Sequence, residues 1–332
     1  MNAREVLAAI DGLQPAVQQA YLDQIAIFIN AVTLAEVERA LQEEDNEALL
    51  LGIFALLIEQ FRTAFIKGGT QELKGARVAG LIIGKEFDAH ADQAASFLRN
   101  QSRELLGQVM ADQAQAVQAV LSAGQARGQS TRKTALDLIG RVSKQTGKRT
   151  GGVLGLGGNF ATSVTAAKDE LLSGDPAKLK KYLSRTRRDP VFDKVVKEAI
   201  EGRQRIGLDV ADRIAGRYAN RLLETQAQMI TETFTAQAFN EGRDQAWRQI
   251  ADKSKVPIVI EKTWRSKRDE KVRLSHSLMN GQKVAQDQPF SSPHGSLLMF
   301  PCDASLGAPL NERARCRCVA EYSAVKALTI QP

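Results

Sequence analysis

Residues 262–322 read KTWRSKRDEKVRLSHSLMNGQKVAQDQPFSSPHGSLLMFPCDASLGAPLNERARCRCVAEY. This stretch decides the fold, because it holds one of the two tryptophans, two of the three histidines, all three cysteines and four of the nine prolines. The residues before it are mostly Ala, Leu, Gln, Glu and Arg, with apolar positions at helical spacing. The pattern predicts a compact C-terminal module with a specified shape, carried by helices.

Within the module, short apolar runs alternate with turn residues. Residues 256–260 (VPIVI), extended by KTW at 262–264, are typical of a strand. Residues 269–278 predict a short helix that ends at the turn pair Asn280-Gly281, and residues 316–322 predict a final strand. We therefore expect a small α+β domain over residues 253–325, followed by a tail at 326–332.

Upstream of the module, apolar periodicity and capping residues predict helices almost throughout. Residues 1–70 form an acidic helical segment of two or three helices, in which Thr33 and Glu36 have capping-box spacing and the Gly-Gly pair in KGGT (67–70) is expected to end the unit. Residues 71–145 predict a helical hairpin or bundle, with a long helical region over 86–125 and a helix over 133–144 capped by Ser130. Association of copies through a coiled coil is the alternative for this part. The chain is thus expected to be mainly α, with extended helical N-terminal and middle regions.

A glycine-rich stretch, TGKRTGGVLGLGGN, occupies residues 146–159. It is not a Walker phosphate loop, because Lys148 is followed by Arg149 and no hydroxyl is placed for magnesium. The composition favours a flexible joint with a basic tip.

Charge is distributed unevenly along the chain. The net charge is +7 and the pI is about 9.3, yet residues 1–60 carry two basic and ten acidic side chains. Residues 160–252 form a basic helical region, in which Asp175-Pro176 and Asp189-Pro190 are expected to start helices. Its basic side chains suit non-specific contact with the phosphates of double-stranded DNA, although a solvated helix face is the alternative. The candidate phosphate contacts are Lys148, Arg149, Lys178, Lys180, Lys181, Arg185, Arg187 and Arg188.

Targeting and membrane signals are weak. The first twenty residues are acidic and do not resemble a signal peptide, and the apolar run at 48–58 is shorter than the ~20 residues that cross a bilayer. Three cysteines in the last thirty-one residues do not make a secreted disulfide framework. We expect synthesis in a reducing cytoplasm and no stable membrane insertion.

One ordered set of residues in the module carries a family resemblance. The order is W-x4-D-x3-R-x2-H-x4-G, then F, P-x-D and a closing C-R-C, and it falls on Trp264, Asp269, Arg273, His276, Gly281, Phe290, Pro301, Asp303, Cys316, Arg317 and Cys318. It resembles the C-terminal domain of the phage Mu protein F-like family, the minor head or head morphogenesis proteins of tailed bacteriophages. The resemblance covers about residues 222–322, and a helical segment with Glu224 and an NEGR turn at 240–243 resembles the part that precedes the domain. Members usually have Asn before C-R-C, where this chain has Arg315.

The resemblance implies a low-copy structural protein of the phage head rather than an enzyme. Its expected partners are the portal protein, capsid and scaffold proteins and double-stranded DNA, touched during packaging or ejection, with a homo-oligomer as a further expectation. Its expected place is the virion head near the portal vertex, after assembly in the host cytoplasm. Two alternatives stay open: a toxin-type enzyme with a Mu F-like module, and a membrane-active ejection protein that inserts residues 48–65.

The cysteines and histidines of the module raise a metal question. If Cys316 and Cys318 lie two apart on a strand, both sulfurs point to one face, and His276 with Cys302 or His294 could complete a tetrahedral zinc site. The default expectation is no cofactor and buried thiols packed in the core, and a disulfide from Cys302 is the remaining alternative. Asp269 and Arg273, four apart on the predicted helix, are expected to form an ion pair.

Overall fold

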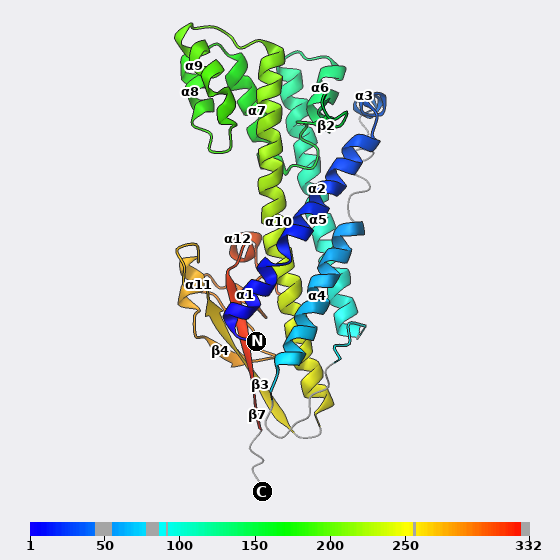
Figure 1. Cartoon of the computed structure of the whole chain (residues 1–332), viewed down its shortest axis with the longest axis vertical. Coiled ribbons are helices and arrows are strands. Elements are labelled where there is room, and N and C mark those ends of the chain that lie inside the picture. The colour runs from blue at the N-terminus through cyan, green and yellow to red at the C-terminus, as the bar shows by residue number, and fades with distance from the viewer. Residues whose placement is uncertain (44–54, 78–85, 91, 255–256, 327–332) are drawn as a thin grey trace. The chain divides into compact units, whose positions relative to one another are not determined.

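A computed structural model describes residues 1–43, 55–77, 86–90, 92–254 and 257–326 (Figure 1). The chain is mainly helical with small antiparallel sheets near its C-terminus, which confirms the predicted fold class. It divides into two compact units, each built from separated stretches. Unit 1 is Met1–Ala20, Leu56–Ser102 and Gln228–Pro332, and unit 2 is Tyr21–Ala55 and Arg103–Ala227. The domains predicted from the sequence were consecutive segments, whereas each of these units combines stretches that are far apart in the chain. Three helices contribute residues to both units: α2 (Gln14–Ala31), α5 (Asp92–Ala126) and α10 (Leu208–Lys253).

Unit 1 places a small three-stranded antiparallel sheet beside helices. The sheet has the order β4-β3-β7, and a separate two-stranded ladder joins β5 to β6. The elements are α1 (Ala3–Asp11), α4 (Ala55–Gly75), β3 (Ile258–Ser266), α11 (Leu274–Leu278), β4 (Lys283–Ala285), β5 (Phe290–Ser291), β6 (Leu297–Leu298), α12 (Leu310–Arg313) and β7 (Cys318–Lys326).

Strand β3 confirms the strand predicted from residues 256–264, although it begins at Ile258 and ends at Ser266, and Val256 lies outside the described residues. It is the central strand of the sheet. Its inward positions alternate, as a half-buried strand requires: Ile260, Lys262 and Trp264 are buried. The buried Lys262 donates to the carbonyls of Gln286 and Met299 at 2.8 and 2.7 Å. Burial lowers its pKa to about 8. A cation inside the sheet is thus satisfied by backbone oxygens rather than by solvent.

Two predicted elements of the module have different bounds in the structure. The helix predicted over 269–278 begins only at Leu274, because Arg273 has extended backbone and residues 269–272 form turns. The strand predicted over 316–322 begins at Cys318 and runs to Lys326, paired with β3 along its whole length. Cys316 therefore precedes the strand.

Unit 2 contains short helices whose starts follow the predicted caps. Thr33 and Glu36 form the capping box of α3, Ser130 caps α6, and Asp175 caps α8 with Pro176 at its first turn. The elements are α3 (Leu34–Gln42), α6 (Thr131–Ile139), β1 (Arg141–Val142), β2 (Arg149–Thr150), α7 (Gly158–Leu172), α8 (Pro176–Leu183), η2 (Pro190–Phe192) and α9 (Asp193–Glu201). The predicted helix 133–144 is shorter, since Gly140 ends α6 at a φ of 79°.

The glycine-rich stretch at 146–159 is exposed at its basic tip, residues 146–148, but packed at 153–158, so the prediction of a flexible joint is wrong for its second half. Val153, Leu154 and Leu156 are each 1% exposed. Gly151 lies so close to Gly216 that a Cβ on it would be 2.7 Å from the Gly216 Cα. The glycines allow close approach of backbones, which sequence composition does not distinguish from flexibility.

Glycines also seat α4 against the part of α10 that belongs to unit 1. A Cβ on Gly68 would lie 2.2 Å from the Phe239 carbonyl oxygen, and one on Gly242 would lie 2.0 Å from the Phe65 carbonyl oxygen. Helix α4 therefore continues through Gly68 to Gly75, and the predicted stop at 67–70 is wrong. Residues 240–243 likewise lie inside α10 rather than in a turn.

A buried ion pair holds the same two helices together. Arg243 Nε donates to Glu72 Oε2 at 2.8 Å, and Trp247 Nε1 donates to Glu72 Oε1 at 3.0 Å. Both charged side chains are almost fully buried, at 0% and 1% exposed. Burial opposes the charged form of Glu72, but Arg243 and Trp247 outweigh it and lower the pKa of the carboxyl.

Candidate metal centre

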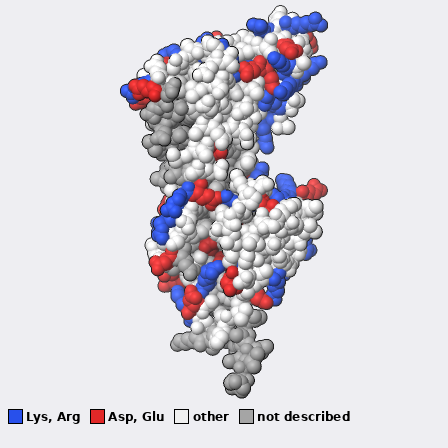
Figure 2. Space-filling view, turned by 180° about the vertical axis from the view of Figure 1, so that it is seen from behind, with Lys and Arg blue, Asp and Glu red and all other residues white. Residues whose placement is uncertain are grey.

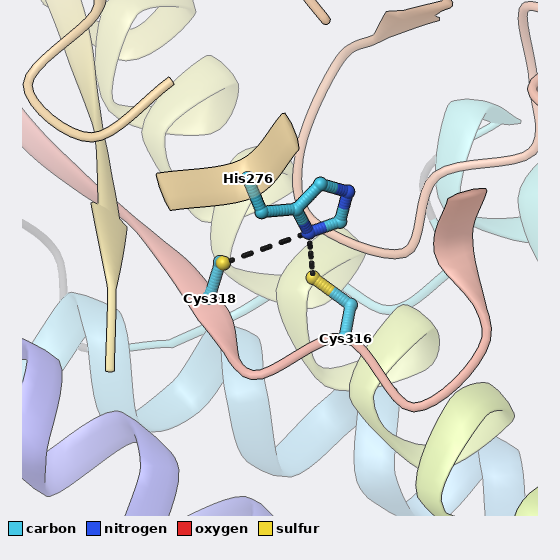
Figure 3. Close-up of side chains that lie close together, drawn as sticks. All are labelled: His276, Cys316 and Cys318. Atoms are coloured by element: carbon cyan, nitrogen blue, oxygen red, sulfur yellow. Dashed lines mark hydrogen bonds between the residues drawn. The ribbon is translucent and has the colours of Figure 1, made fainter. Parts of the chain in front are cut away.

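Three buried side chains of unit 1 converge at the start of β7. His276, from α11, directs its Nδ1 toward the sulfurs of Cys316 and Cys318, at 3.3 and 3.7 Å (Figure 3). Arg315, just before them, has a φ of 53°, and this left-handed residue leads the chain into Cys316. The convergence predicted from a shared strand face is reached although Cys316 lies outside the strand. The three donor atoms lie within 4.8 Å of one another and could hold a metal ion.

The other side of the imidazole is fixed as well. His276 Nε2 lies 3.2 Å from Glu312 Oε1, which comes from α12. The ring of Trp264 meets the imidazole edge-on, with centroids 5.3 Å apart. An outer carboxylate partner of this kind orients a histidine whose other nitrogen faces a metal or a thiol. Glu312 was missed from the sequence, because its spacing of four residues from Cys316 matches no known ligand pattern.

The charges of the group are set by mutual hydrogen bonding. Burial raises the pKa of Cys316, but hydrogen bonds with Cys302, Cys318 and His276 outweigh it and hold that pKa well below its usual range. Hydrogen bonds to Cys316, followed by burial, raise the pKa of both Cys302 and Cys318. Burial lowers the pKa of His276, but its interactions with Cys316 outweigh this and raise it. The hydrogen bonds therefore favour the thiolate form at Cys316 over Cys302 and Cys318.

Neither of the two further ligands considered from the sequence, Cys302 and His294, belongs to the group whose donor atoms lie within 4.8 Å of one another. Cys302 is fully buried, has a φ of 72° and is hydrogen-bonded to Cys316. His294 is exposed in the turn between β5 and β6, and it is outside the three-residue group. All three thiols are free, so the disulfide alternative is not formed in this structure.

The spacing of the donor atoms fits a tetrahedral ion. A Zn–S bond of about 2.3 Å and a Zn–N bond of about 2.05 Å at a tetrahedral angle place sulfur and nitrogen about 3.6 Å apart. The two observed separations, 3.3 and 3.7 Å, bracket that value. Thiols and imidazole are also the donors that structural zinc sites use.

The framework around the group uses a different ion pair from the one expected. Asp269 accepts from Arg317, at 2.6 Å from Nη2 and 3.0 Å from Nε, rather than pairing with Arg273. Arg273 donates to the carbonyl of Ala314. The predicted Asp269–Arg273 pair is wrong because it required a helix that begins only after both residues. The observed contacts instead tie the segment before α11 to the segment before β7.

The remaining motif residues shape the same core. Phe290 meets Trp264 edge-on with centroids 5.2 Å apart, and Gly281, at a φ of 92°, donates its N–H to the Trp264 carbonyl. Asp303 accepts from the backbone of Met299 and of Ser305, each at 2.8 Å. The Pro301 carbonyl accepts from Asn240 of α10.

The candidate DNA-contacting residues lie in unit 2, around α8 and at the start of β2. Figure 2 shows Lys and Arg gathered over the end of unit 2 that carries α8 and α9. Three of the eight are engaged by carboxylates: Arg185 binds Glu170 through two bonds of 2.8 Å, Lys181 lies 3.5 Å from Glu170, and Arg188 binds Asp193. Arg149 donates to the Gly140 carbonyl at 3.3 Å. Lys148, Lys178, Lys180 and Arg187 are exposed and have no ion-pair partner among the described residues.

Comparison with family models, with curated proteins and with solved structures finds no match to this chain. Within the described residues, no single helix has the length and apolar character of a membrane span. One bent pair, Ala3–Ala31 with Leu34–Gln42, has them only when its two parts are taken together across a 79° bend. In the apolar run at 48–58, residues 48–54 lie outside the described residues and residues 55–58 form the start of α4.

Proposed function

We propose that this chain is a minor head protein of a tailed phage, with a structural rather than a catalytic role. The supporting observation is that motif residues up to fifty-four positions apart meet in one core: Trp264 contacts His276 and Phe290, and His276 contacts both cysteines of C-R-C. A motif that encodes a shape rather than an exposed site suits a protein that docks into an assembly. Its proposed partners are the portal, capsid and scaffold proteins, with self-association also proposed, inside the head near the portal vertex.

Co-expression with the portal and capsid genes of the same phage tests this role. The chain is expected to sediment with proheads and to be lost from them when the portal gene is omitted. Its absence from proheads that contain the portal would contradict the proposal.

The finer part of the proposal is that the buried group holds zinc. Cys316, Cys318 and His276 would bind it, and Cys302 would have to move closer to them to be a fourth donor. The ion would supply structural cross-linking of α11 to the start of β7, because zinc sites contribute folding energy directly.

Metal analysis of the purified full chain tests this. We expect about one zinc per chain, lost in Cys318→Ser, with a lower melting temperature after chelation. Ser277→Ala, an exposed change on α11, is the matched control and should keep the metal. Metal-free protein whose melting temperature is unaffected by added zinc would contradict the site.

We also propose that unit 2 touches double-stranded DNA without sequence preference. Four exposed, unpaired cations among the candidate residues predict that the logarithm of the binding constant falls with the logarithm of salt at a slope of about −3 to −4, since each neutralised phosphate contributes about −0.9. Fluorescence anisotropy on a labelled duplex measures the slope. Lys178→Ala/Lys180→Ala should make it shallower by about 2, whereas Lys194→Ala, beside Glu198 on α9, should change it less. Salt-insensitive or undetectable binding would remove the DNA contact and leave the structural role.

One observation favours a toxin-type enzyme as a second candidate. His276 faces the Cys316 thiol through Nδ1 and the Glu312 carboxylate through Nε2. In a cysteine enzyme the same arrangement places a thiol nucleophile, a histidine base and a carboxylate that orients the histidine. Alkylation by iodoacetamide separates the two roles. Selective labelling of Cys316 in metal-free protein, abolished in His276→Ala, would favour the enzyme, and protection of all three thiols by zinc would favour the structural role.

A further inference from the structure

A cavity of about 490 Å³ lies in unit 1, and Cys316 of the candidate metal centre is one of the residues that line it. Its walls come from α1 and the start of α2, from the unit 1 part of α10, from the segment between β3 and α11, and from the residues just before β7. Small-molecule sites in proteins have volumes of about 300 to 1,000 Å³. The cavity is therefore large enough for one nucleotide-sized ligand.

The lining of this cavity is strongly cationic. Five basic side chains line it, against the two carboxylates of Asp11 and Glu232. The basic residues are Lys267, Lys271, Arg273, Arg315 and Arg317. Like charges gathered in a hollow with low-dielectric walls focus the field on whatever enters it. Such a lining attracts an anion.

Two of the basic residues in the lining are held by carboxylates, and two others form no ion pair among the described residues. Arg315 is held by Glu232 through Nε and Nη2, and Arg317 is held by Asp269 through the same two nitrogens. Each guanidinium has five N–H donors, so both keep donors for a ligand in a fixed orientation. Lys267 and Lys271 are exposed and, among the described residues, form no ion pair.

Another part of the lining is apolar. Leu7 and Ile10 of α1 and Ala236 of α10 contribute it. A ligand with a flat apolar body and a concentrated negative charge would satisfy both parts of the lining. A phosphate puts up to two charges on one group, which suits converging cations better than carboxylates spaced along a peptide.

We propose that this cavity binds the phosphate of a nucleotide, with the base against the Leu7–Ile10–Ala236 wall. The source of the phosphate is either a free nucleotide or the end of a nucleic acid strand. A continuous rigid duplex does not enter a cavity of this size, so the site is separate from the DNA contact proposed for unit 2. The inference rests on the cavity and not on the proposed function.

Calorimetric titration of the full chain tests the site with four probes: inorganic phosphate, dTMP, a 5′-phosphorylated single-stranded oligonucleotide, and a blunt duplex without terminal phosphates. We expect binding of dTMP or of the phosphorylated strand that Lys267→Ala/Lys271→Ala weakens at least tenfold, which is about 1.4 kcal/mol. Lys194→Ala/Lys197→Ala, an exposed lysine pair on α9 outside the residues proposed to contact DNA, is the matched control and should leave this binding unchanged. Tighter binding of dTMP than of the phosphorylated strand would identify the ligand as a free nucleotide. Tighter binding of the strand would identify it as the end of a nucleic acid strand.

Three results would overturn the proposal: no binding of any phosphate probe, equal loss in both double variants, or stronger binding of poly-glutamate than of either nucleotide probe. Circular dichroism confirms that the double variant is folded, which is expected because both lysines are exposed. Failure of the duplex to bind bears only on unit 2, so the two proposals fail separately.

Discussion

Gly242→Ala separates close packing from helix propensity, because the two effects have opposite signs. In the middle of a helix, Ala is favoured over Gly by about 1 kcal/mol. At Gly242 the new Cβ would lie 2.0 Å from the Phe65 carbonyl oxygen and 2.9 Å from the Gly69 nitrogen, both backbone atoms. Backbone gives way only if α4 moves, so overpacking should reach the upper end of its range, about 3 kcal/mol. The expected net loss is about 2 kcal/mol, and more if the Glu72–Arg243 pair separates.

Gly107→Ala is the matched control. Gly107 lies inside α5, is exposed, and no described atom is within 4 Å of a Cβ built there. The same substitution should therefore stabilise the chain by about 1 kcal/mol. Urea unfolding followed by circular dichroism measures both midpoints. A Gly242→Ala chain as stable as the wild type would refute the packing argument, because it would show that α4 and α10 tolerate the added methyl.

Three other substitutions test the charges of unit 1. Burial, followed by the charge of Asp244, raises the pKa of Glu241 from 4.5 to about 8. The stability that the protonated carboxyl contributes is complete below pH 4.5 and is lost as the pH rises to 8, roughly 5 kcal/mol in all. Glu241→Gln should therefore flatten the dependence of the melting temperature on pH over that window, and an unchanged pH profile would contradict this. Glu72→Ala should cost about 3 to 5 kcal/mol in urea unfolding because it leaves Arg243 charged and buried, and a loss below 1 kcal/mol would show that water reaches the pair. Arg315→Asn should leave stability within about 1 kcal/mol, since Asn tolerates the left-handed backbone and the half-exposed ion pair lost is weak; a large loss in calorimetry would mean that this pair holds the segment before β7.

Some of the candidate site could be predicted from residue types and spacing alone. The order of tryptophan, histidine and cysteines pointed to one module, and His276, Cys316 and Cys318 do come together. The predicted position of Cys316 in a strand was wrong, and Glu312 was not foreseen. Both depend on which distant segments pack around α11, and spacing along the chain carries no information on that.

The sequence by itself determined the helical class, strand β3 and the helix starts at Thr33, Ser130, Asp175 and Asp189, because capping and alternation act within a few residues. Only the tertiary structure decided the roles of the glycines. The same Gly-rich composition that signals a loose joint or a helix stop seats Gly151 against Gly216 and Gly242 against α4. The tertiary structure also decided that Asp269 binds Arg317 rather than Arg273. A glycine's missing side chain and a carboxylate's choice of partner are settled by what comes within a few ångströms in space, and those neighbours are set by the packing of segments far apart in the chain.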